Sequence, residues 1–144
     1  LRHHIDWAIQ GVLGNWIKLS WNLQPLMPGT FRTQLEFRAP QGAASEIASV
    51  LRSWHYLNFE IIEGSETGGE LFRFTPELGI HRAVVDQSGS VLINENQLTT
   101  LLSSSFDEDS IREGIARLMG NSWELELERF RSVDLQELPR LHAI

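Results

Sequence analysis

The sequence predicts an α+β protein with a mostly antiparallel sheet of about five to six strands, one N-terminal helix, one inserted helix and a helical C-terminal region. Two observations predict this class. Apolar residues recur at helical spacing near the start of the chain, in one internal segment and after residue 94, whereas they alternate with polar residues in between. Short turns containing proline or glycine join the alternating segments, which favours antiparallel pairing.

The first helix is predicted by an apolar stripe with i, i+3, i+4 and i+7 spacing that starts at Ile5 and includes Trp16. A Gly-Asn pair just before this tryptophan is the predicted stop, because both residues tolerate a left-handed backbone. Residues 16–23 and 31–38 then alternate between apolar and polar side chains. Because a short loop of prolines and glycine joins them, we expect an antiparallel hairpin with a charged outer face.

The segment 43–54 carries the clearest amphipathic helical stripe of the chain. Four shorter alternating segments follow, at residues 57–61, 71–74, 80–85 and 91–93. The glycine-rich run that starts at Gly64 is interpreted as a hairpin loop, since a phosphate-binding loop would end in Gly-Lys-Ser/Thr and lead into a helix. Pro76 lacks an amide donor and is expected to interrupt strand pairing.

Two capping patterns predict where the first two helices of the C-terminal region begin. Asn94 is followed by Gln97, and Ser105 by Glu108, at the three-residue spacing in which two side chains satisfy free backbone amides. Leucines follow the first pattern and isoleucines the second, again at helical spacing. We therefore expect two short helices that begin at these caps.

A third helix is predicted after Gly120, which with Asn121 breaks or kinks the preceding one. Its apolar face carries Trp123, Leu127 and Phe130. Pro139 is expected to end regular structure. The tail at residues 140–144 could then add an edge strand.

The composition excludes several classes of protein. The chain has 144 residues, no cysteine and a formal net charge of −7, with 42% hydrophobic residues. The length fits a single α+β domain over residues 1–144, and since the chain starts at Leu1 inside a helix, we expect a short natural N-terminal segment to be missing. Thiol nucleophiles, disulfides and thiolate metal sites are excluded, and the acidic balance argues against nucleic acid. No apolar run approaches the ~18–20 residues of a membrane span, so we expect a cytoplasmic protein.

Several separated blocks of the chain resemble an actinobacterial protein family of unknown function, domain-of-unknown-function family three-one-four-five. The blocks are His4-Ile5-Asp6-Trp7-Ala8, Gln24-Pro25, Leu51-Arg52-Ser53-Trp54, Thr75-Pro76-Glu77-Leu78-Gly79-Ile80-His81, Gly120-Asn121-Ser122-Trp123, Glu126-Leu127-Glu128-Arg129-Phe130-Arg131 and Leu141-His142. Members of the family carry a further apolar segment before the first helix, and many carry a Cys-Pro pair where this chain has Arg2-His3. The resemblance implies a cytoplasmic bacterial protein and supplies neither a reaction nor a ligand.

The candidate chemistry centres on His4, Glu77 and His81. Glu77 and His81 lie in the segment with the most unusual residue choices, and a carboxylate beside an imidazole could act as a base and an acid. The alternative is a crossover turn whose proline and glycine serve backbone geometry. No two histidines stand at the i, i+4 spacing of a helical zinc pair, so we expect no metal site, the alternative being a site assembled from distant residues such as His4, Glu77 and His81. We expect no cofactor.

Two further groups of residues have a structural interpretation. Glu124 and Glu128 could hold a cation, but arginines three residues after Glu126 and Glu128 favour a salt-bridged helix face. Three of the five tryptophans, Trp16, Trp54 and Trp123, close apolar helical stripes and are predicted to lie in the core. Trp7 lies off the apolar face of its helix, which makes it a candidate interface residue.

Two functions from different classes follow. The leading hypothesis is a non-enzymatic binding or regulatory module that acts through protein contacts, with a protein partner or as a homodimer. It predicts an exposed apolar patch larger than a few hundred Å². The alternative is an enzyme or small-ligand binder with a pocket around His4, Glu77 and His81, which predicts that these side chains converge on one concave site.

Overall fold

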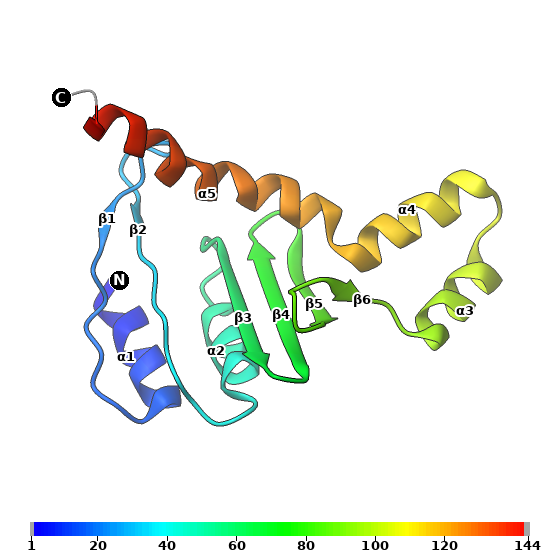
Figure 1. The fold of residues 1–144 in the computed structure, drawn as a ribbon, viewed down its shortest axis with the longest axis horizontal. Helices are drawn as coiled ribbons and strands as arrows, with labels where there is room; N and C mark the ends of the chain where they lie inside the picture. The colour runs from blue at the N-terminus through cyan, green and yellow to red at the C-terminus, as the bar shows by residue number, and fades with distance from the viewer. Residues whose placement is uncertain (1, 143–144) are drawn as a thin grey trace.

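A computed structural model describes residues 2–142, and the side chains of residues 2–132. The described residues form five helices and two antiparallel sheets, which confirms the α+β class (Figure 1). The elements are α1 (Arg2–Leu13), β1 (Asn22–Leu23), β2 (Phe31–Arg32), α2 (Ala43–Leu51), β3 (Phe59–Ser65), β4 (Gly68–Thr75), β5 (Gly79–Val85), β6 (Val91–Leu92), α3 (Glu95–Ser104), α4 (Glu108–Met119) and α5 (Asn121–His142).

The larger sheet contains four strands in the order β3-β4-β5-β6, all antiparallel. Its first hairpin is tighter than the sequence suggests, because β3 continues to Ser65 and β4 starts at Gly68. The glycine run therefore belongs to the strands and their turn, and it is a hairpin connection as predicted. A Cβ atom on Gly69 would overlap the backbone of Glu63, which explains why glycine is needed there.

One face of this sheet packs on α2, and α1 packs in turn on α2. The core at this interface contains buried aliphatic and aromatic side chains from both helices, from β3 and β4, and from the segment between α1 and β1. They are Ile5, Ile9, Leu19, Ala44, Ile47, Ala48, Leu51, Ile61 and Phe72. Burying such side chains contributes about 1.5–3 kcal/mol each to folding, so this layer is the main source of stability on that face.

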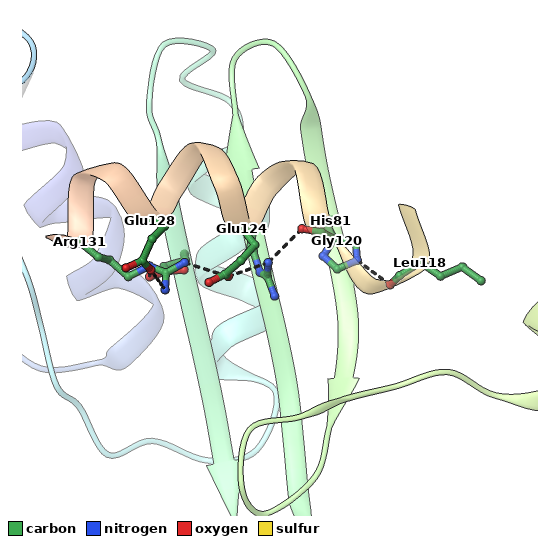
Figure 2. Close-up of polar contacts among 8 residues, drawn as sticks. His81, Leu118, Gly120, Glu124, Glu128 and Arg131 are labelled. Carbon is green, nitrogen blue, oxygen red and sulfur yellow. Dashed lines mark hydrogen bonds and ion pairs between the residues drawn. The ribbon is translucent and has the colours of Figure 1, made fainter. Parts of the chain in front are cut away.

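The opposite face of the sheet is crossed by α5 (Figures 1 and 2). Trp123 and Leu127, two of the predicted apolar residues of this helix, are buried against it. The helix begins at Asn121, directly after Gly120, which has a left-handed backbone with φ of 76° and ends α4. This confirms the predicted break at Gly120.

The hairpin of β1 and β2 forms a separate two-stranded sheet, in which Asn22 is opposite Arg32. Antiparallel pairing is confirmed, but it covers only two residues per strand instead of the predicted 16–23 and 31–38. The arms of the hairpin contribute side chains to the core, because Leu19 is buried and residues such as Leu35 pack against its edge. Side-chain packing on α1 and α2 thus replaces backbone pairing along most of each arm.

The prediction of a buried Trp16 is wrong, since 79% of this side chain is exposed. The helix ends at Leu13, and Gly14, with φ of 73°, turns the chain away. The helical spacing that placed Trp16 on the apolar stripe therefore does not apply beyond the turn. Trp54 lies three residues after α2 ends at Leu51 and is half-buried at the edge of the core, so its predicted core position is confirmed only in part.

The helix caps follow the sequence in one case and differ in the other. Asn94 and Gln97 form the predicted capping box at the start of α3. The predicted box of Ser105 and Glu108 is wrong: Asp107 caps α4 by accepting from the amide of Ser110 at 2.8 Å. The Ser105 hydroxyl instead donates to a carbonyl of α3, so it was already engaged with the preceding helix.

The predicted end of regular structure at Pro139 is also wrong, because α5 continues to His142. A proline removes one backbone hydrogen bond and can bend a helix locally without ending it. The proposed edge strand is therefore helical up to residue 142, and residues 143–144 lie outside the described part of the chain. No helix within the described residues is long and apolar enough to cross a bilayer.

Candidate functional site

Three polar side chains lie in a row on the face of the sheet that α5 covers. Glu60 on β3 is opposite Arg73 on β4, and Arg73 is opposite His81 on β5. The two short turns between these strands fix the register and so place the three residues side by side. Together with Glu124, Glu128 and Arg131 of α5, they form a set of contacts that we call the α5 clamp (Figure 2).

His81 joins the sheet to the junction of α4 and α5. Its Nε2 atom lies 3.0 Å from the carbonyl oxygen of Leu118, and because a carbonyl only accepts, the imidazole donates this bond. The ring also stacks on Trp123 with centroids 4.9 Å apart. Burial lowers the pKa of His81 below its ordinary value, and the nearby charge of Arg73 lowers it further, while the bond to Leu118 opposes the shift.

The other nitrogen of His81, Nδ1, is buried and has no hydrogen-bond partner among the described residues. A second proton on the ring would therefore add a buried donor without an acceptor, which costs about 1–3 kcal/mol. The lowered pKa of His81 and the absence of a partner for Nδ1 both indicate that His81 is a neutral imidazole in the clamp.

Arg73 is the buried charge at the centre of the clamp, with 6% of the residue exposed. Its Nη1 atom donates to the carbonyl oxygen of Gly120 at 3.1 Å and lies 3.1 Å from a carboxylate oxygen of Glu124 (Figure 2). His81 thus satisfies a carbonyl in the last turn of α4, where a helix has free acceptors and a partial negative charge. Arg73 adds a second donor to the Gly120 carbonyl, which also accepts from the amide of Glu124 in α5.

Arg131 closes the clamp on the side of β3. It pairs with Glu60 at 2.9 Å, with Glu124 at 2.9 Å and with Glu128 at 2.7 Å. Burial raises the pKa of Glu60, although the positive charge of Arg131 acts to lower it. The hydrogen bond from Arg131 lowers the pKa of Glu124. The predicted ion pairs Glu126–Arg129 and Glu128–Arg131 are confirmed.

The clamp is suited to hold a helix in place. Its acids and bases are engaged with one another or with backbone carbonyls, and no group of three or more potential metal ligands occurs in the described part of the chain. Buried polar contacts of this kind fix one orientation of a helix on a sheet, because the charges have few other partners. The clamp therefore fixes where α4, and the segment before it, leaves the sheet.

The segment from Asn94 to Met119 forms a helical arm that projects beyond the sheet (Figure 1). Neither α3 nor α4 contains a buried residue. The two helices cross closely at Gly114, where a Cβ atom would overlap the side chain of Leu101. Leu98 and Leu102 lie one turn apart on α3 and are 37% and 62% exposed, and Phe106, in the loop between α3 and α4, is 99% exposed.

The structure places the candidate residues His4, Glu77 and His81 in three different surroundings. His4 is exposed on α1 and stacks on Trp7, whereas His81 is buried on the far face of the sheet beneath α5. Glu77 is exposed after β4 and lines a pocket of about 130 Å³ to which neither histidine contributes. A catalytic or ligand-binding role for the three residues remains a prediction.

A second depression, of about 350 Å³, lies at the base of the arm. It is lined by Asn94, Asn96, Gln97, Thr100 and Leu118. These side chains offer amides, one hydroxyl and an apolar group, and none of them titrates near neutral pH.

Sequence reasoning missed Glu60, Arg73 and Gly120. A signal for the first two was available, since Arg73 interrupts an apolar run between Phe72 and Phe74, and a charge in such a strand needs a partner. The two turns then place opposite charges in register across β3 and β4. Gly120 was identified as a helix break, but its carbonyl contact with Arg73 depends on how the helix lies on the sheet.

Fold and site together define a small α+β protein in which a charged clamp fixes a helix on a four-stranded sheet and a helical arm extends beyond it. The chain belongs to the family described as Protein of unknown function (DUF3145), which matches residues 1–139. No curated protein and no solved structure matches the chain.

Proposed function

We propose that the protein is a non-enzymatic binding or regulatory module that acts through protein contacts, and that the helical arm is its binding element. The observation that carries this proposal is the exposure of apolar side chains on α3 and on the loop after it, in an arm whose two helices contain no buried residue. Phe106 is 99% exposed, and an aromatic side chain covers about 150–250 Å². Leu102 and Leu98 add exposed apolar surface on α3, and a contiguous apolar patch of more than a few hundred Å² would mark an interaction site.

The clamp supports the proposal because it determines the direction of the arm. Arg73 and His81 hold the carbonyls of Gly120 and Leu118, the residues through which α4 is joined to α5. A binding element held by a rigid body loses less conformational entropy on binding than a free one. The body of the protein thus serves to orient the arm toward its partner.

A second group of exposed apolar residues lies on the β1–β2 hairpin, but two of its members already have contacts. Phe31 lies under the guanidinium of Arg2, at 4.0 Å from ring centroid to Cζ. Met27 lines the pocket that Glu126 and Arg129 of α5 also line. The arm has no comparable cover, which is why we place the binding surface there. Trp7, 65% exposed on α1, stays a further candidate for an interface.

The proposal includes a location in the cytoplasm of an actinobacterium, with neither nucleic acid nor a membrane as partner. The net charge of −7 supports the first of these exclusions. The resemblance of the chain to an actinobacterial family supports the proposed location.

The test is capture of partners from the native host with the tagged protein. The wild type is compared with a Leu102→Ser/Phe106→Ser double variant and with a matched control, Tyr56→Ser, which removes an exposed aromatic ring after α2. We expect a specific protein to be retained by the wild type and the control, and to fall at least about tenfold on the double variant, a change of about 1.4 kcal/mol. Equal retention by the double variant, or no retained protein, would contradict the proposal.

A further inference from the structure

We propose that His81 is a pH-sensitive latch: protonation of its imidazole releases the α4–α5 junction from the sheet, while the sheet itself stays folded. The arm is then no longer held in one direction. This inference rests on the proposed function, because it assigns a means of regulation to the proposed binding element.

The first argument is that few contacts attach the junction to the sheet. α4 contains no buried residue, and it packs mainly on α3 and α5. Its last turn is joined to β5 by the bond of 3.0 Å from His81 to the carbonyl oxygen of Leu118. The next attachment, two residues further on, is the bond from Arg73 to the carbonyl oxygen of Gly120. A change at His81 therefore acts at the point where the arm leaves the sheet.

The second argument is that the closed junction has no acceptor for a second proton on the ring. Because Nε2 donates to Leu118, Nδ1 carries no hydrogen in the neutral imidazole. Nδ1 is buried without a partner among the described residues, and His81 is only 8% exposed. A Cβ atom on Gly120 would lie 2.6 Å from Nδ1, so the backbone of the junction lies against this side of the ring. A proton on Nδ1 therefore favours an open junction, in which water accepts its hydrogen bond.

The third argument is the charge around the ring. The neighbour of His81 on β4 is Arg73, a buried cation that disfavours a second one. Arg117 in the last turn of α4 is exposed, and Arg82, next along β5, lies on the opposite face of the sheet and pairs with Glu70. The remaining charged groups of the clamp lie on β3 and α5, where each acid is paired with an arginine. They are Glu60, Glu124, Glu128 and Arg131. A protonated His81 thus has no unpaired acid of the clamp beside it.

The direction of the response follows from these surroundings. Burial lowers the pKa of His81 from its ordinary value of 6.5, and the charge of Arg73 lowers it further, against the bond to Leu118. In an open junction the ring is in contact with water, so the open state binds the proton more tightly than the closed one. Opening is therefore favoured as the pH falls below about 6.5, by at most about tenfold per pH unit for one proton.

The experiment is hydrogen–deuterium exchange of the full chain at about pH 7.5 and about pH 5.5, with each rate divided by the intrinsic rate of that amide. The amides of Gly120 and Glu124 are hydrogen-bonded at the junction and report on it, whereas those of β3 and β4 report on the sheet. His81→Gln keeps a donor for Leu118 and does not titrate. His4→Gln is the matched control, since this histidine is exposed on α1.

In the wild type and in His4→Gln, we expect protection at the junction to fall by at least about fivefold between the two pH values. It should also stay at least about tenfold below that of the sheet, which exchanges only when the whole protein unfolds. In His81→Gln, protection at the junction should change by less than about twofold. The imidazole signals of His81 in NMR spectra of the wild type should titrate with the same midpoint as the opening, which tests the latch without a variant.

The inference is overturned by a junction whose protection does not change with pH, by an equal change in His81→Gln, or by a different midpoint for the His81 ring. Equal protection at the junction and in the sheet would also overturn it, because the two would then open together. If the junction ignores pH while capture from the host still depends on Phe106 and Leu102, the proposed function stands and only the latch is wrong. If the junction opens as expected but no partner is captured, the latch stands and the proposed function is wrong.

Discussion

The imidazole of His81 and the indole of Trp123 stack with their centroids 4.9 Å apart, and this contact joins β5 to the first turn of α5. The indole Nε1 atom also donates to the carbonyl oxygen of Gly79 at 2.9 Å, so Trp123 contacts two residues near the start of β5, Gly79 and His81. The position of the helix on the sheet therefore depends on a few residues that can be changed one at a time.

Replacing Trp123 should destabilise the fold in two steps. Trp123→Phe keeps a ring against His81 but loses the bond to Gly79, for an expected cost of about 1 kcal/mol. Trp123→Ala removes the buried ring and should cost about 3–5 kcal/mol. Urea unfolding followed by circular dichroism measures both. The control is Trp16→Ala, which should change the free energy of unfolding by less than about 0.5 kcal/mol because that side chain is 79% exposed.

Replacing Gly120 should disturb the contact between His81 and the α4–α5 junction. A Cβ atom at this position would lie 2.5 Å from the His81 ring, and φ is 76°. Gly14 is the matched control, since its φ is 73° but a Cβ atom there has no neighbour within 4 Å. Gly14→Ala should therefore cost only the left-handed backbone strain, about 1–2 kcal/mol, and Gly120→Ala should cost clearly more.

A double variant separates backbone strain from the contact with the ring. Adding His81→Ala to Gly120→Ala should recover the steric part of the loss, so the two changes should be non-additive by about 0.5–3 kcal/mol. Equal costs for Gly14→Ala and Gly120→Ala, or simple additivity of the pair, would show that the ring is not tightly packed against Gly120.

The stability of the protein should fall as the pH drops through the range in which histidine titrates. Because the pKa of His81 is lowered in the folded state, the unfolded chain binds more protons between the two pKa values, and unfolding is favoured as pH falls below about 6.5. For one proton the slope is at most about 1.4 kcal/mol per pH unit. Urea unfolding between about pH 7.5 and pH 5.5 measures it.

The variant His81→Gln isolates this contribution, since an amide can still donate to Leu118 but does not titrate. Glu60 acts in the opposite direction: its pKa is raised, so protonation as the pH falls favours the folded state. The difference between the wild type and His81→Gln therefore reports on His81 alone. An unchanged slope in the variant would assign the pH dependence to other groups.

Removing the guanidinium of Arg73 should weaken the attachment of α5. Arg73→Met fills the same space but leaves the Gly120 carbonyl with only the amide of Glu124 and the Glu124 carboxylate with only Arg131, for an expected loss of about 1–2 kcal/mol in the free energy of unfolding. The cost stays below that of a fully buried orphan charge because 48% of the Glu124 side chain is exposed. Arg112→Met is the control, since its pair with Glu108 is about three-quarters exposed and should contribute less than about 0.5 kcal/mol.

Most elements of the fold could be predicted from local sequence, and the errors occur where the chain leaves its local pattern. The helix predicted at 43–54 shows its period within a few residues and is confirmed as far as Leu51, and the helix after Asn94 shows both its period and its cap and is confirmed as well. Trp16 was misplaced because its spacing matches a helix that ends at Leu13. Pro139 was misread because a single missing amide did not end α5.

The candidate site could be predicted only in part. His81 was selected for its neighbours in the sequence, Pro76 to Gly79, and it does belong to the clamp. Its contacts are with Leu118 and Trp123, however, nearly forty residues or more away along the chain. No periodicity within β5 indicates which helix will cover it.

By itself, the sequence determined the type and order of most elements and the antiparallel connections of the larger sheet, whereas the register that aligns Glu60, Arg73 and His81 follows from the length of the turns in the structure. These are consequences of residues within one turn of a helix or one hairpin. Only the tertiary structure decided that α5 lies across this row, that Arg131 meets Glu60, and that α3 and α4 are left without cover. The physical reason is that the sequence of a helix or strand shows which of its faces is apolar and will be buried. Which other element covers that face depends on packing and charge across the whole molecule.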